Sequence, residues 1–155
     1  MIRDLTDEQA ARRTTVSELC LGGLVKHVTA TERQWMRFIR EGPSAMAWPG
    51  DAAAGDAGAG DAAAGDWSAR FCMLPGETVA GLLADYEQVA HETEGLLATL
   101  PDLDAAHPLP DAPWFERGAR WSARRVILHV IAETAQHAGH ADIIREALDG
   151  AKSMG

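Results

Sequence analysis

The chain has 155 residues, of which 46% are hydrophobic and 24% are charged, a composition typical of a soluble globular protein. This length is sufficient for one domain with a substantial hydrophobic core. The net charge of −9 argues against nucleic acid as a partner, because binding to phosphates requires a positively charged surface. The basic side chains form only one small cluster, at Arg117, Arg120, Arg124 and Arg125.

The cysteines and the apolar runs bear on where the protein is expected to act. Cys20 and Cys72 are the only cysteines and have no CxxC spacing, so a reducing compartment is expected and a disulfide framework is not. Residues 1–25 lack the basic stretch followed by an apolar stretch that marks a signal peptide. No apolar run approaches the length of a membrane span. We therefore expect a cytoplasmic protein with no membrane partner.

Two helices are predicted in the first 40 residues. The segment Thr6–Gln9 has the form of a capping box and predicts a short helix that runs to about residue 13. A second helix begins between Ser17 and Leu21 and runs to about Arg40, where a Gly-Pro pair ends it. Its apolar residues recur mostly at intervals of three and four, and His27 lies on or beside that stripe.

A low-complexity segment follows. From residue 51 to residue 66 the pentad Asp-Ala-Ala-Ala-Gly recurs with one change, and it offers no large apolar group to bury. We interpret it as part of a flexible acidic loop over about residues 44–68. The alternative is a calcium site, but aspartates five residues apart do not match the alternating ligands of an EF-hand loop.

Two longer helices are predicted in the second half. The third helix runs from about Thr78 to Leu100 and ends at a proline, and residues 101–119 read as an irregular connection. The fourth helix begins at about Ser122, a plausible N-cap, and continues to Leu148 before a glycine ends it. No segment shows a run of alternating strand residues, so the predicted fold class is all-α.

The fourth helix carries the most informative pattern in the chain. His129, Glu133, His137 and His140 follow one another at spacings of four, four and three, which places them along one helix face. Another histidine, His27, lies in the second helix. Two ligands one turn apart, together with a histidine from a facing helix, are the means by which a helical bundle builds a metal site in its core.

Simpler interpretations compete with the metal site. Glu133 and His137 could form an ordinary surface pair that stabilises the helix slightly. Against this, Glu133 is flanked by Ile131 and Ala132, and a buried carboxylate without a partner is costly, so a metal ion would supply the missing charge. For the remaining histidines, a role as hydrogen-bonded core or boundary residues is preferred; these are His91, His107 and His129.

Several segments resemble the DinB superfamily and, more narrowly, its DUF664 or mini-circle protein branch. The resemblance rests on Leu24–His27, Glu32–Trp35, Phe71–Leu74 and above all Glu133–Glu146, and covers most of the chain except residues 44–68. It implies an antiparallel four-helix bundle with a divalent metal ion, typically zinc or nickel, between its helices.

The resemblance also implies a ligand set. The family uses one histidine from an early helix and a His-x-x-x-His or Glu-x-x-x-His pair on a late helix, which correspond to His27, Glu133 and His137. His140 departs from the wider superfamily, where an Arg-Gly-Gln sequence usually supplies glutamine. We therefore expect His140 beside the site, as a catalytic or supporting group or as an alternative ligand.

Many relatives have a further helix before the point where this chain begins. The first helix of the bundle would then be missing or shortened, borrowed from a partner, or lost to a late start codon. Because one side of such a bundle is thinly covered, we expect a homodimer that buries that side.

Three protein ligands leave one coordination position open, which is the pattern of a catalytic site. Relatives with this ligand set include S-transferases and isomerases that use mycothiol or bacillithiol. The composition, rich in Ala, Gly, Asp and Arg, resembles that of proteins from high-G+C bacteria, and this favours mycothiol as the thiol. The leading hypothesis is a metal-dependent enzyme that activates this small thiol, as co-substrate, for attack on an electrophile such as a xenobiotic or an antibiotic. The alternatives are a stress-associated metalloprotein, hydrolytic or non-catalytic, whose ion is mainly structural, and an inactive member that serves as a dimerisation module.

Overall fold

A computed structural model of the chain describes residues 2–46 and 69–153, so most of the predicted 44–68 loop, including the repeat at residues 51–66, lies outside the described part. The described part is mostly helical, which confirms the predicted fold class. Its elements, in chain order, are the helices α1 (Asp7–Ala11) and α2 (Leu21–Glu41), the 3₁₀ helix η1 (Gly42–Met46), the helix α4 (Val79–Thr99), the strands β1 (Ala106–Pro108) and β2 (Arg120–Ser122), and the helix α5 (Ala123–Asp149).

The helix ends follow from local capping chemistry. Thr6 and Gln9 form the predicted capping box at the start of α1. The hydroxyl of Ser122 accepts the backbone N–H of Arg125 in the first turn of α5, and Gly150 ends that helix in the left-handed conformation, with a φ of 79°. The cap of α2 is less usual, because the Cys20 sulfur accepts the Gly23 N–H at 3.3 Å.

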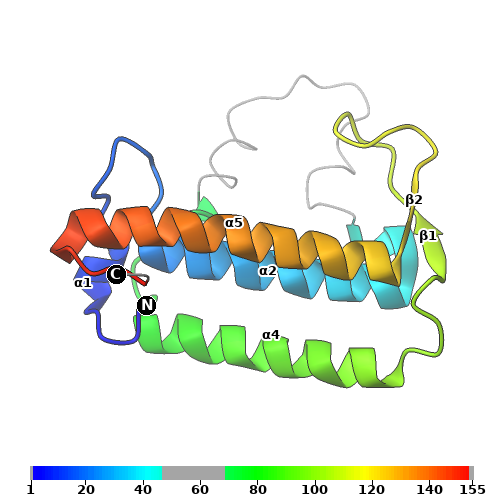
Figure 1. Cartoon of the computed structure of the whole chain (residues 1–155), viewed down its shortest axis with the longest axis horizontal. Helices are drawn as coiled ribbons and strands as arrows, with labels where there is room; N and C mark the ends of the chain where they lie inside the picture. The colour runs from blue at the N-terminus through cyan, green and yellow to red at the C-terminus, as the bar shows by residue number, and fades with distance from the viewer. Residues whose placement is uncertain (1, 47–68, 154–155) are drawn as a thin grey trace.

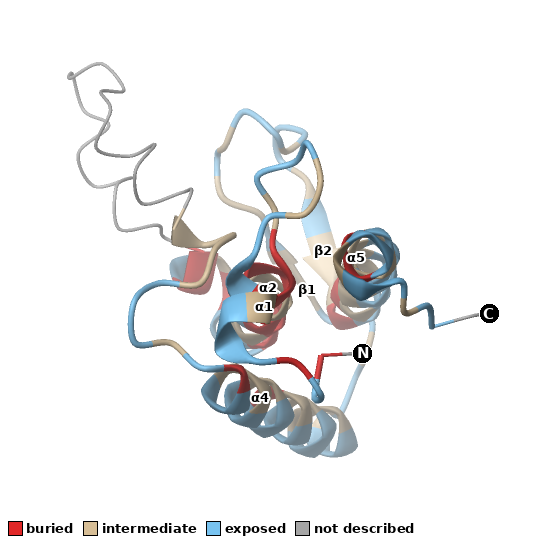
Figure 2. Ribbon diagram, turned by 90° about the vertical axis from the view of Figure 1, so that its left-hand side faces the viewer, coloured by how far each residue is buried: buried red, intermediate tan, exposed pale blue. Residues whose placement is uncertain are grey.

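Helix α2 forms the centre of the bundle, and α4 and α5 both pack against it (Figures 1 and 2). Helix α5 runs antiparallel to the other two long helices, as predicted, whereas α2 and α4 run in the same direction (Figure 1). Helices α4 and α5 make few contacts with each other, so a groove lies between them, and α2 forms its floor.

Two buried clusters form the core, one at each end of the bundle. The cluster near the hairpin contains Trp35, Met36, Phe38, Ile39, Ala45, Met46, Ala123 and Val126. The cluster near the N-terminus contains Ile2, Leu5, Ala10, Leu21, Leu24, Val79 and Ile144. Because Ala45 and Met46 are buried in η1, the first residues of the predicted 44–68 loop belong to the core.

The N-terminal segment is short but firmly attached. The buried guanidinium of Arg145 donates to both carboxylate oxygens of Asp4, at 2.9 and 2.7 Å, and also pairs with Asp149. The Thr14 hydroxyl donates to the Ile144 carbonyl at 2.9 Å. The first helix of the bundle, α1, has only five residues, so it caps one end of the long helices and does not run along them.

The connection over residues 101–119 is less irregular than predicted. It contains β1 and leads into β2, and the two strands pair antiparallel with His107 opposite Trp121. His107 also contacts the Ile39 carbonyl oxygen at 3.2 Å through its Nε2 atom, which agrees with the structural role expected for it. Among the described residues, no helix is both long enough and apolar enough to cross a membrane.

Candidate metal centre

The three residues predicted as metal ligands lie together where α5 crosses α2. His27 comes from α2, and Glu133 and His137 come from successive turns of α5, as their spacing requires. One candidate ligand atom from each side chain lies within 4.8 Å of the other two. The two imidazole rings meet edge to face, with centroids 4.8 Å apart. All three residues are half-buried.

The separations suit a small divalent ion. Ligand atoms at about 2.1 Å from a tetrahedral ion lie about 3.4 Å from one another. The His137 Nε2 atom is 3.6 Å from the nearer Glu133 carboxylate oxygen, close to this value. Since no pair of ligand atoms in the cluster exceeds 4.8 Å, side-chain shifts of about 1 Å would bring all three ligand atoms to coordinating distance from one ion. The donor set and its geometry therefore fit one ion.

The electrostatics of the cluster favour the metal-binding form of both histidines. Burial lowers the pKa of His27, repulsion from His137 lowers it further, and the Glu133 carboxylate opposes both effects. Burial also lowers the pKa of His137, against the same carboxylate. Both imidazoles are therefore neutral at pH 7, and a neutral imidazole has the free lone pair that coordinates a metal.

His140 lies beside this group and is not part of it. Its Nδ1 atom is 3.4 Å from the Nδ1 atom of His137, so one of these two nitrogens can donate a hydrogen bond to the other when it carries the ring proton. This contact leaves the Nε2 atom of His137 on the side of Glu133. A histidine that binds a metal commonly uses its second ring nitrogen for such a hydrogen bond, which selects the tautomer and orients the ring.

His129 shares the helix face but takes no part in the cluster. Its ring packs edge to face against Trp35 and Trp121, with centroids 5.1 and 5.0 Å away. The two indoles stack on each other at 4.9 Å, and the Arg125 guanidinium lies over Trp121 at 5.1 Å. His129 is therefore a boundary residue, as expected, and it separates the metal cluster from the core near the hairpin.

One residue of the site was not identified from the sequence. The ring of Phe71 stacks on the ring of His27, with centroids 4.4 Å apart and an angle of 28° between the planes. The run Phe71–Leu74 was noted only as part of the family resemblance. A better signal was the Gly22-Gly23 pair one turn before His27, since adjacent glycines inside a helix often mark the close approach of another segment.

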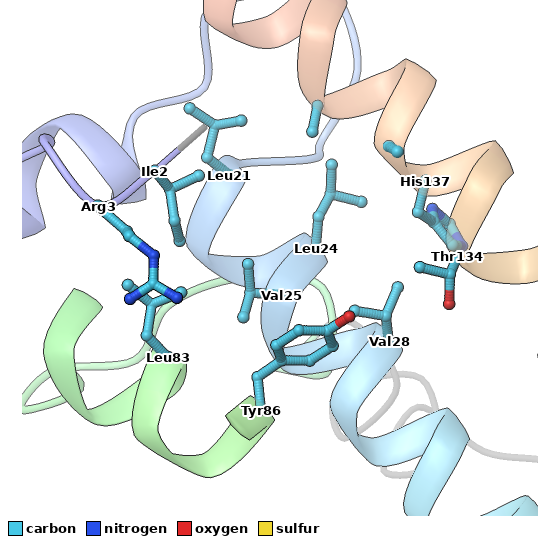
Figure 3. Close-up of a pocket in the computed structure, with 12 residues that line it drawn as sticks. Ile2, Arg3, Leu21, Leu24, Val25, Val28, Leu83, Tyr86, Thr134 and His137 are labelled. Atoms are coloured by element: carbon cyan, nitrogen blue, oxygen red, sulfur yellow. The ribbon is translucent and has the colours of Figure 1, made fainter. Parts of the chain in front are cut away.

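A mainly apolar pocket of about 260 Å³ lies on the other side of His137, between α2, α4 and α5 (Figure 3). Leu24 and Val28 of α2 form its floor, and Leu83 and Tyr86 of α4 form one wall. Since His137 lines both the pocket and the metal cluster, the two features share one side chain.

The family model described as mycothiol-S-transferase matches residues 1–150 of the chain. The comparisons with curated proteins and with solved structures give no match.

Proposed function

We propose that this chain, which belongs to the mycothiol-S-transferase family within the DinB superfamily, is a metal-dependent enzyme that joins mycothiol to an electrophilic small molecule. The observation that carries the proposal is the meeting of His27, Glu133 and His137 at one point between α2 and α5. The family match over nearly the whole chain supports the choice of thiol. The DUF664 branch remains a prediction from the sequence.

The proposed ligand set is two neutral imidazoles and one carboxylate. Histidine and carboxylate ligands suit zinc and nickel, and three protein ligands leave a position open for a substrate. When bound, such an ion would lower the pKa of a thiol so that the thiolate form is available at neutral pH. Glu133 balances part of the charge of the ion, which suits a half-buried site.

We assign His140 a supporting role in this site. Through the contact between the two Nδ1 atoms it holds the ring of His137 and keeps Nε2 directed toward the ligand cluster. In the overall conjugation, the thiol sulfur forms a bond to an electrophilic carbon, the leaving group departs with its electron pair, and the thiol proton goes to solvent. In this scheme His27, Glu133 and His137 bind the ion, Glu133 also balances part of its charge, and His140 orients the His137 ring.

A structural role for the ion is the second candidate. His27 and the Glu133–His137 pair come from different helices, so an ion between them would join α2 to α5. In a bundle whose first helix has five residues, this link would stabilise the fold even without catalysis.

The deciding experiment combines elemental analysis with a conjugation assay. We expect about one zinc or nickel ion per purified chain, together with mycothiol-dependent displacement of chloride from a chromogenic aryl chloride that stops after chelation. One ion per chain without conjugation, across a panel of electrophiles, would favour the structural role. Protein that takes up no stoichiometric divalent ion would overturn both candidates.

A further inference from the structure

We propose that Phe71 is a positioning residue of the metal centre, which holds the His27 imidazole in the orientation that meets Glu133 and His137. The inference rests on the proposed metal site and adds a residue to it. On one side, the ring of His27 lies nearly parallel to the Phe71 ring, with centroids 4.4 Å apart. On the other, it meets the His137 ring at 77°. A rotation of the His27 ring would break the stacking contact, so Phe71 restricts that rotation.

The backbone of Phe71 is held in place by the surface of α2. A Cβ atom on Gly23 would lie 1.9 Å from the Phe71 carbonyl oxygen, and one on Gly22 would lie 2.1 Å from the Met73 sulfur. The Met73 side chain could move away from a Cβ atom at position 22, but the Phe71 backbone could not avoid one at position 23. The segment 71–73 therefore approaches α2 this closely because position 23 is glycine. Glycine inside a helix costs about 0.5–1 kcal/mol relative to alanine, and the close approach offsets that cost.

Polar contacts attach the same segment on both sides of the glycine pair. The Cys20 sulfur lies 4.0 Å from the Phe71 carbonyl oxygen. Lys26, next to His27 in the chain, contacts the Cys72 carbonyl oxygen at 3.5 Å and pairs with Glu77 at 2.6 Å. Glu77 in turn accepts the Leu74 backbone N–H at 2.7 Å.

These contacts give the stacking ring a defined position. The segment 71–77 is anchored to α2 one turn before His27 and at the residue directly before it. The Phe71 ring is therefore fixed relative to the helix that carries His27, and not only relative to the imidazole itself. A supporting group held in this way raises metal affinity because the ligand loses less rotational freedom on binding.

The test measures zinc affinity, by competition with a chromophoric chelator, and the absorption spectrum of the cobalt-loaded protein. We expect Phe71→Ala to weaken zinc binding about 10–100-fold, the range typical of groups that support a metal ligand. Phe71→Tyr keeps the flat ring and should restore affinity. Gly23→Ala keeps the Phe71 ring but displaces its backbone, so it should also weaken binding and alter the cobalt spectrum.

Phe115→Ala is the matched control. Phe115 is also half-buried and also packs against aromatic rings, but its neighbours are Trp35 and Trp121 and not a metal ligand. The Phe115→Ala substitution should leave zinc affinity unchanged. The inference is overturned if folded Phe71→Ala and Gly23→Ala both bind zinc as the wild type does, or if Phe115→Ala weakens binding equally. A wild-type protein that binds no zinc would overturn the metal centre itself, which distinguishes the two failures.

Discussion

Replacing His137 by alanine is the most direct perturbation of the metal centre. Structural zinc sites with four ligands bind with about 10–16 kcal/mol, or about 2.5–4 kcal/mol per ligand. Losing one of three ligands should therefore weaken zinc binding about 60–700-fold, since about 1.4 kcal/mol corresponds to a factor of ten. Alanine is the best helix former, so α5 should remain intact.

The effect can be followed by thermal unfolding. With zinc at about 100 times the dissociation constant, the wild type should gain about 2.7 kcal/mol of stability. For a chain of this size, that corresponds to an increase in Tm of about 5–11 °C. At the same zinc concentration, His137→Ala should gain at most about 0.6 kcal/mol of stability, or about 1–2 °C in Tm.

Circular dichroism of chelator-treated protein, with and without added zinc, measures both shifts. His91→Ala is the control, because His91 is exposed on α4 and takes no part in the ligand cluster. It should keep the wild-type response. If His137→Ala keeps the full zinc-induced increase in Tm, the assignment of this residue as a ligand is wrong.

Three further predictions address the neighbouring features. His140→Ala should lower conjugation activity more than metal content, because it removes the contact that orients His137; equal losses in both measurements would contradict this role. Because burial lowers the pKa values of His27 and His137 below the ordinary 6.5, the unfolded state binds more protons as the pH falls through this value. The Tm of the metal-free protein should therefore decrease below about pH 6.5, and a Tm independent of pH between 8 and 5.5 would exclude this effect. Finally, Leu128 and Ile131, 57% and 59% exposed on α5, should be buried in a homodimer. Light scattering should detect the dimer at micromolar concentration, and Ile131→Glu should dissociate it; a wild-type monomer would exclude it.

The local features of this fold could be predicted from the sequence because their causes are local. Thr6, Ser122 and Gly150 mark helix ends through contacts within one turn, and the structure begins and ends α1 and α5 close to these residues. The hairpin could not be predicted in this way, because its strands have three residues each, too few to show an alternating pattern.

In the candidate site, too, the features with local causes could be predicted from the sequence, and those that depend on packing between distant segments could not. Glu133 and His137 share a face because of helical periodicity alone. The inclusion of His27 depends on the packing of α5 against α2. The sequence made His27 a candidate because it lies on another helix, and the family resemblance supplied its pairing with Glu133 and His137. Phe71 was missed because its approach to His27 depends on contacts between segments about 50 residues apart, such as the approach of its carbonyl oxygen to Gly23.

Helix α4 contributes a wall to the pocket but no residue to the ligand cluster, which comes entirely from α2 and α5. Changes at Leu83 or Tyr86 can therefore reshape the pocket while the donor atoms stay in place. This separation makes α4 a suitable place for mutational libraries. It also gives natural variation a route by which the shape of the cavity can change across descendants of this chain while ion binding is retained.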